Sequence, residues 1–189
     1  MPIITEKTTT PPLLNLQRIG HGTLAVIDLA KTRAFFEELM GFDVIQTSPI
    51  SLMIRKGTDH VYAVVEVGDR EDEMDRFNHN GVDVGSIEEV DKAFEIVSSV
   101  KEKYGIREIR KPGIRHGDYS FFFCDRDGNW WEIVKVREGG YAADFGDPER
   151  DLTGLGQELA GRRGVRVHTH DEEFRDSIRD ARAAQSERQ

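Results

Sequence analysis

The sequence predicts an α+β fold in which two β-α-β-β-β modules form a curved mixed sheet. Two observations predict it. The first half begins, at 20–28, with a stretch in which apolar and polar residues alternate as they do in a β-strand. A similar stretch begins the second half at 77–84. In each half, one helical stripe and three short strand candidates then follow in the same order. This internal repeat indicates two units that lie side by side and enclose a concave interior.

The first module contains one predicted helix, over residues 29–41. Its apolar side chains recur at helical spacing, Asp28 can cap its start and Gly41 can end it. Three short strands are expected after the helix, at 43–46, 51–55 and 60–67.

The second module follows a charged linker and has the same order. After the opening strand at 77–84, a stripe of apolar residues predicts a helix over 87–103. The segment 125–129, Asp-Arg-Asp-Gly-Asn, predicts a tight turn, because Asp, Asn and Gly tolerate the backbone angles of a hairpin. The remaining strands are expected at 107–110, 119–124 and 130–136.

The composition changes along the chain in a way that indicates three parts. They are a flexible N-terminal arm at 1–16, the paired modules at 17–138 (17–68 and 76–138), and a charged, partly helical extension at 139–189. Helices are expected in the extension within 148–163 and 169–184.

Charge and apolar content exclude several classes of partner. The net charge of −9 argues against nucleic acid and against an anionic membrane surface as partners, because both are negatively charged and are bound by proteins through basic surfaces. No apolar run approaches the ~18 residues that span a bilayer, and the first twelve residues lack the apolar core of a signal peptide. Cys124 is the single cysteine, so no internal disulfide can form and a reducing cytoplasm is expected.

Three residues stand out as candidate metal ligands. His21 and His79 occupy equivalent positions in the opening strands of the two modules, and Glu132 lies in the last strand. By alternation Glu132 shares a face with Trp130 and Val134, where a carboxylate is costly unless it is paired or bound to metal. Two imidazoles and one carboxylate suit Fe(II), Mn(II) or Zn(II) and leave coordination positions open, which would place a metal site inside the curved sheet.

The same segments resemble the vicinal oxygen chelate superfamily over about residues 17–136. The resemblance rests on Gly20-His21-Gly22-Thr23-Leu24, on Phe77-Asn78-His79, and on Asp125-x-Asp127-Gly128-Asn129-x₂-Glu132. It implies that His21, His79 and Glu132 bind the metal, as the matching positions do in metal-dependent members. It also implies a homo-oligomer, since members often dimerise.

Within the superfamily, the chain most resembles a single-domain type I extradiol dioxygenase. Asp59-His60-Val61-Tyr62-Ala63 looks like the segment that carries the acid–base histidine of these enzymes, which makes His60 the candidate. The resemblance implies Fe(II), O₂ and a catechol-like aromatic diol as substrate, with His116 and Tyr119 hydrogen-bonded to the substrate oxygen. The positions that usually hold the histidine and tyrosine donors hold Gly113 and Phe122 here.

Two other functions fit the same residues. A glyoxalase-like lyase or an epimerase would use Zn(II), Ni(II) or Mn(II) to polarise a carbonyl, with His60 as a base or a fourth ligand. A non-catalytic protein that binds an aromatic ligand between the modules would need no metal.

Overall fold

A computed structural model describes residues 7–57, 59–69, 74–115, 118–146, 151 and 153 of the chain. Residues Asn15–Gly113 and Tyr119–Lys135 form one compact unit, which carries both modules, and the other described residues belong to a second unit. The helices predicted within 148–163 and 169–184 lie outside the described residues, apart from positions 151 and 153.

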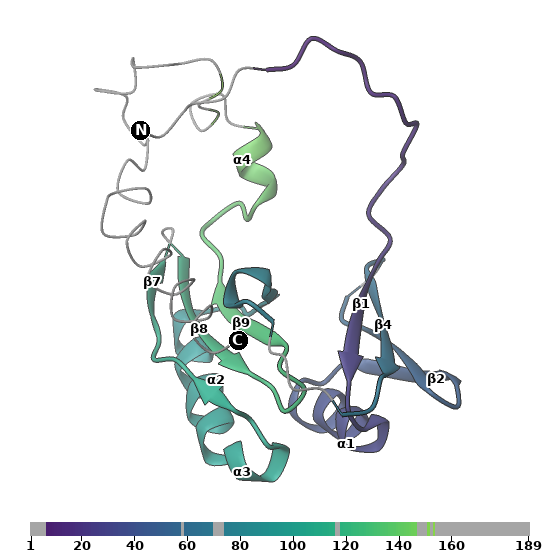
Figure 1. Ribbon diagram of the computed structural model, residues 1–189. Helices are drawn as coiled ribbons and strands as arrows, with labels where there is room; N and C mark the ends of the chain where they lie inside the picture. Colours follow the sequence, from purple (N-terminus) through teal and green to yellow (C-terminus); the bar gives the residue numbers. More distant parts are fainter. Residues whose placement is uncertain are drawn as a thin grey trace, which may run out of the picture. The chain divides into compact units, whose positions relative to one another are not determined.

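The first module is a four-stranded sheet with the order β1-β4-β3-β2 (Figure 1). The strands are β1 (His21–Val26), β2 (Asp43–Ser48), β3 (Ser51–Arg55) and β4 (Val61–Glu66). Strand β1 runs parallel to β4, and the other neighbours are antiparallel. The predicted strand at 60–67 therefore begins one residue later, which leaves His60 in the preceding loop.

The helix of this module begins at Leu29 as predicted and ends at Leu39, two residues before the predicted end. It consists of α1 (Leu29–Ala34) and one turn of π-helix, η1 (Phe35–Leu39). The Asp28 carboxylate accepts a hydrogen bond from the Lys31 backbone N–H at 3.0 Å, which satisfies one donor that the first turn leaves unpaired. At the other end Gly41 adopts φ 63°, a left-handed conformation that glycine reaches without strain.

The second module repeats this topology with the order β5-β9-β8-β6. Its elements are η2 (Arg76–Asn78), β5 (Asn80–Asp83), α2 (Ile87–Ser99), α3 (Lys101–Tyr104), β6 (Glu108–Ile109), β8 (Asp118–Cys124) and β9 (Trp130–Lys135). Strand β5 runs parallel to β9, as β1 does to β4, and β8 runs antiparallel to β9. The α+β fold with two β-α-β-β-β modules is confirmed. Two elements were not predicted, β7 (Gly113–Arg115), which pairs with β8, and α4 (Ala142–Gly146).

The strand predicted at 77–84 begins only at Asn80. Asp75 accepts a hydrogen bond from the Phe77 backbone N–H at 2.9 Å and so caps a short 3₁₀ turn, η2, in place of the first strand residues. His79 follows that turn with extended backbone and lies immediately before the strand.

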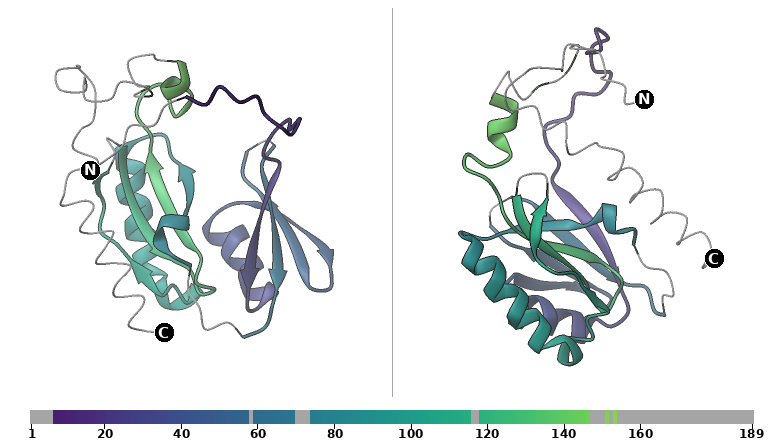
Figure 2. Two further views of the ribbon diagram at one scale, coloured as in Figure 1. Left: turned by 45° about the horizontal axis from the view of Figure 1, so that its top comes forward. Right: turned by 90° about the vertical axis from the view of Figure 1, so that its left-hand side faces the viewer.

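Helix α2 lies along one face of the second sheet in both views of Figure 2. The capping box between Ser86 and Glu89 fixes its start. Its stripe buries Val90 and Val97, and the Phe94 ring meets the Phe121 ring of β8 edge to face at 5.5 Å. One face of this sheet is thus occupied by helix packing, which leaves the opposite face for a site.

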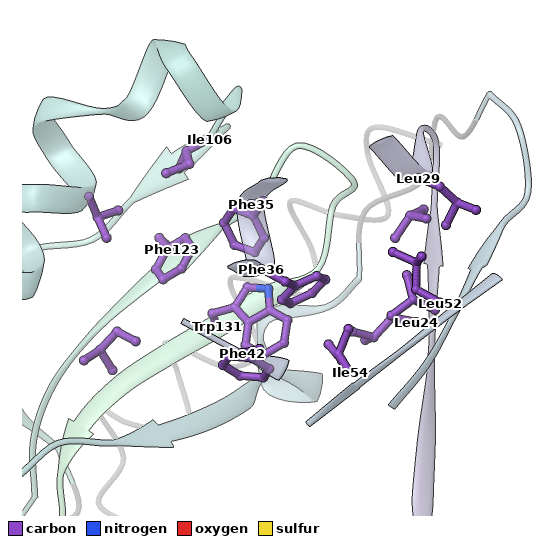
Figure 3. Packing of buried hydrophobic residues seen from close by; sticks show 14 of the residues in the cluster. Leu24, Leu29, Phe35, Phe36, Phe42, Leu52, Ile54, Ile106, Phe123 and Trp131 are labelled. Atoms are coloured by element: carbon purple, nitrogen blue, oxygen red, sulfur yellow. The ribbon is translucent and has the colours of Figure 1, made fainter. Parts of the chain in front are cut away.

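The two modules share one aromatic core (Figure 3). Phe36 and Phe42 of the first module meet the Trp131 ring of β9 at centroid distances of 5.5 and 6.1 Å. Phe35 meets Phe123 of β8 at 6.3 Å. Trp131 is only 1 % exposed, so this contact between modules is a fully buried one.

The turn between β8 and β9 ties the modules together by hydrogen bonds. The predicted hairpin is present, with Gly128 at φ 84°. Asp127 accepts from the Ile27 backbone N–H at 2.8 Å and from the Thr32 hydroxyl at 2.9 Å, both in the first module. Asn129 donates to the Ala25 carbonyl at 3.3 Å. This turn serves as a polar latch, because it satisfies buried groups of both modules at once.

Asp125 lies beneath the latch and is fully buried. Its carboxylate accepts from the backbone N–H groups of Asp127 and Asn129 at 2.8 and 2.9 Å, and from the Trp131 indole N–H at 2.9 Å. Burial raises the pKa of Asp125 to about 6, although these three donors favour the ionised form.

Among the described residues, the structure has no helix that is both long and apolar enough to cross a membrane.

Candidate metal centre

His79 and Glu132 meet at the junction between η2 and the second sheet. The Nε2 atom of His79 lies 3.1 Å from Oε2 of Glu132. Glu132 is in the middle of β9, next to Gly81 of β5, and its side chain is 13 % exposed. A rigid central strand thus presents the carboxylate, and the capped turn before β5 presents the imidazole.

A second contact fixes the tautomer of His79. Its Nδ1 atom lies 2.8 Å from the Arg76 backbone carbonyl, which can only accept, so Nδ1 carries a hydrogen. In the neutral ring, Nε2 then directs a lone pair at the Glu132 carboxylate. Two acceptors at 3.1 Å repel each other unless a cation, either a proton or a metal ion, satisfies both.

In the absence of a metal ion, a proton on His79 can be the cation between the two groups, and the pKa of His79 reflects this. The hydrogen bond to Glu132 raises the pKa of His79, while partial burial acts in the opposite direction. The pair therefore attracts positive charge, which is the property that a metal-binding pair needs.

An apolar wall adjoins the pair. Phe122 is the cross-strand partner of Glu132, and its ring meets the His79 ring edge to face at 4.8 Å. Phe122 also belongs to a buried cluster with Cys124 and Trp130, against which Met74 packs. This wall excludes water from one side of the two donors and strengthens their electrostatic attraction for a cation.

His21, the third predicted ligand, lies on the other module. It is the first residue of β1, its side chain is exposed, and its partner on β4 is Val61. Within the described ranges, no group of three or more His, Cys, Asp or Glu side chains is gathered closely enough to hold a metal ion. The structure thus brings His79 and Glu132 together, with His21 outside their immediate contact.

A hydrogen bond joins the two modules beside these histidines. The Tyr62 hydroxyl of β4 donates to the Asn80 side-chain oxygen at 2.6 Å, and Asn80 directly follows His79. Burial raises the pKa of Tyr62, which keeps the hydroxyl protonated as a donor. The exposed His60 ring meets the Tyr62 ring edge to face at 5.0 Å, so His60 lies on the same module as His21.

One of the two predicted substrate donors, Tyr119, does not lie with this pair. Tyr119 donates to the Asp91 carboxylate of α2 at 2.8 Å. Since Phe122 pairs with Glu132 and side chains alternate along β8, Tyr119 points to the helix-covered face, away from Glu132. His116 lies outside the described residues.

Sequence reasoning missed two participants, Tyr62 and the backbone carbonyl of Arg76. The contact of Tyr62 with Asn80 joins residues 18 apart on two modules, which no local pattern predicts. The Arg76 carbonyl is only three residues from His79, and Asp75, whose side chain can cap a turn, is the local signal that could have indicated it.

Comparison with known proteins gives a consistent result. The model of the Glyoxalase/Bleomycin resistance protein/Dioxygenase superfamily matches residues 18–133. No curated protein matches the chain.

Solved structures share the fold. The fosfomycin resistance protein FosX from Listeria monocytogenes, in its hexagonal form, is 25% identical with a TM-score of 0.53, over 65% of this chain and 96% of that one. A second structure of FosX, complexed with Mn(II) and a sulfate ion, is 22% identical with a TM-score of 0.52, over 67% and 98%. A possible glyoxalase from Bacillus cereus is 23% identical with a TM-score of 0.51, over 63% and 99%.

Proposed function

Because the chain belongs to the Glyoxalase/Bleomycin resistance protein/Dioxygenase superfamily, we propose that it is an enzyme that uses one divalent metal ion bound by His21, His79 and Glu132. The single observation that carries this proposal is the contact between His79 and Glu132. Their facing acceptor atoms call for a cation between them, and the Arg76 carbonyl holds the imidazole in the tautomer that binds metal through Nε2.

The donor set fits a divalent ion. One carboxylate oxygen and imidazole nitrogens are accepted by Fe(II), Mn(II) and Zn(II), and FosX, a protein of the same fold, has been solved with Mn(II). His21 would supply the third donor from β1 in the same chain, since the two modules share a core and a hydrogen-bonded latch. When bound, such an ion supplies Lewis acidity toward an oxygen of the substrate.

For the reaction, we propose redox-neutral chemistry of the kind carried out by a glyoxalase-like lyase, an epimerase or a fosfomycin-modifying enzyme. The likeness to FosX at 25% identity supports this class. The position of Tyr119 supports it as well, because the hydroxyl that extradiol cleavage would need is bonded to Asp91 on the other side of the sheet. His60, exposed in the loop just before β4, is the proposed base that moves a substrate proton.

Extradiol cleavage of a catechol-like aromatic with Fe(II) and O₂ is the second candidate. The specific observation in its favour is the apolar wall beside the pair, where the Phe122 ring packs edge to face against His79. His60 would then be the acid–base residue.

One experiment separates these functions. The protein is purified without oxygen, its metal content is measured, and two panels are assayed: catechols, with O₂ uptake recorded, and redox-neutral substrates such as hemithioacetals, acyl thioesters and epoxyphosphonates. Turnover of the second panel without O₂ uptake supports the first candidate. O₂ uptake with a yellow ring-fission product supports the second. Absence of bound metal together with retained aromatic-ligand binding contradicts both and indicates a binding protein.

A further inference from the structure

Gly22 and Tyr62 form a close pair on neighbouring strands of the first module. They are register partners on β1 and β4, and the Tyr62 ring lies directly over Gly22. A Cβ atom added at Gly22 would meet Cε1 of Tyr62 at 2.6 Å and Cδ1 at 2.8 Å, which real Cβ atoms do not tolerate. Glycine at this position therefore leaves the space through which the tyrosine side chain passes over the edge strand.

Beyond Gly22, the Tyr62 hydroxyl reaches the second module. It donates to the Asn80 side-chain oxygen at 2.6 Å. The connection passes next to both proposed histidine ligands, because Gly22, beneath the Tyr62 ring, follows His21, and Asn80 follows His79. The modules are also joined by the shared aromatic core at Trp131, which is the register partner of Asn80, and by the latch at Asp127 near the start of α1.

We propose that the Tyr62–Asn80 hydrogen bond, passing over Gly22, is a positioning link that ties the strand of His21 to the segment of His79, so that His21 can join the His79–Glu132 pair on one metal ion. The inference rests on the proposed metal site and adds positioning residues that touch neither metal nor substrate. Loss of a group that hydrogen-bonds directly to a metal ligand costs about 10–100-fold in affinity. The Tyr62–Asn80 bond acts one residue away from His79, through the backbone, so the lower end of that range is expected.

The structure provides a matched pair of substitutions for the test. Gly22→Ala forces the Tyr62 ring to move, whereas Gly20→Ala, on the other side of His21, meets no atom within 4 Å. Tyr62→Phe removes only the hydroxyl, and Asn80→Ala removes only its acceptor. Asn80→Asp keeps an acceptor oxygen and serves as the conservative variant.

The measurement is the Mn(II) dissociation constant of the full chain and each variant, with the urea midpoint of the metal-free protein recorded alongside. Tyr62→Phe, Asn80→Ala and Gly22→Ala are each expected to weaken Mn(II) binding about 10-fold or more. The double variant Tyr62→Phe/Asn80→Ala is expected to lose no more than either single one. Gly20→Ala is expected to stay within about threefold of the wild type. Asn80→Asp, whose added carboxylate beside His79 also attracts the cation, is expected to bind Mn(II) at least as tightly as the wild type.

Two outcomes overturn the proposal in distinguishable ways. If the wild type binds Mn(II) and Tyr62→Phe binds it equally tightly, the link has no positioning role even if the urea midpoint falls, and the metal site stands. If the wild type binds no Mn(II), Co(II), Zn(II) or Fe(II), the proposed metal site fails, and the positioning role fails with it.

Discussion

The imidazole of His79 and the carboxylate of Glu132 face each other at 3.1 Å across the start of the second sheet. The backbone carbonyl of Arg76 holds the other ring nitrogen, so the pair is oriented before any ligand arrives. An oriented imidazole–carboxylate pair beside an apolar wall is a site with high affinity for positive charge. We propose that His21, on the other module, completes the site.

A mixing experiment tests whether one chain supplies all three ligands. His21→Ala and His79→Ala each remove one ligand, and the two variants are unfolded, combined and refolded together. Because the shared core and the Asp127 latch join both modules within one chain, we expect no recovery of tight Mn(II) binding in the mixture. If each site instead took His21 from one copy and His79 from another, mixed dimers would restore about a quarter of the wild-type number of Mn(II) sites. That recovery would contradict a site completed within one chain.

The latch at Asp127 should contribute strongly to stability. Asp127→Ala leaves the Ile27 N–H and the Thr32 hydroxyl without their acceptor in a buried setting, and we expect the free energy of unfolding to fall by about 3 kcal/mol. Urea denaturation measures this loss. The control is Asp43→Ala, which removes an exposed ion pair with Arg55 and should cost less than about 1 kcal/mol. Equal losses in the two variants would argue against a latch.

Much of this fold follows from local signals in the sequence. The cap at Asp28, the stop at Gly41 and the turn at Gly128 are conformational requirements of single residues, and all three are present in the structure. The internal repeat predicts that the second half forms a sheet like that of the first half. A single module of this size can bury its apolar face only by packing against a second module. Glu132 was predicted to share a face with Trp130 because residues two apart in a strand point to the same side of the sheet.

The limits of the sequence reasoning lie in register and in turns. The face on which Tyr119 lies depends on which residue of β8 pairs with Glu132, and this long-range pairing puts Phe122 beside Glu132 and turns Tyr119 toward Asp91. The turn capped by Asp75 replaces strand residues before His79 and places the Arg76 carbonyl on its Nδ1. The β8–β9 register has no signature in a short window of sequence, whereas the turn has one in Asp75, which the strand-like pattern at 77–84 outweighed.

The buried carboxyl of Asp125 predicts a dependence of stability on pH. Its pKa in the folded protein is about 6, against an ordinary value of 3.8, so the folded state binds more protons than the unfolded state between those values. This group's contribution to the free energy of unfolding is therefore greatest below pH 4 and falls as pH rises to about 6, by about 3 kcal/mol in all.

Comparison with Asp125→Asn isolates that contribution, since the amide does not titrate. Urea denaturation of both proteins between pH 4 and 7 gives the difference in unfolding free energy at each pH. We expect the advantage of the wild type over the variant to shrink as pH rises through this window and to be constant above it. A difference that grows with pH would mean that the N–H groups of Asp127, Asn129 and Trp131 outweigh burial and lower the pKa of Asp125.

The most direct test of the central claim is a Mn(II) titration of the wild type and of Glu132→Gln. The substitution keeps the shape of the side chain and removes its charge, and Glu88→Gln, on the exposed side of α2, is the matched control. The wild type and Glu88→Gln should each bind one Mn(II) per chain, and Glu132→Gln should bind it more than about 100-fold more weakly. Undiminished binding in Glu132→Gln, or no binding in the wild type, would contradict a metal centre built on His79 and Glu132.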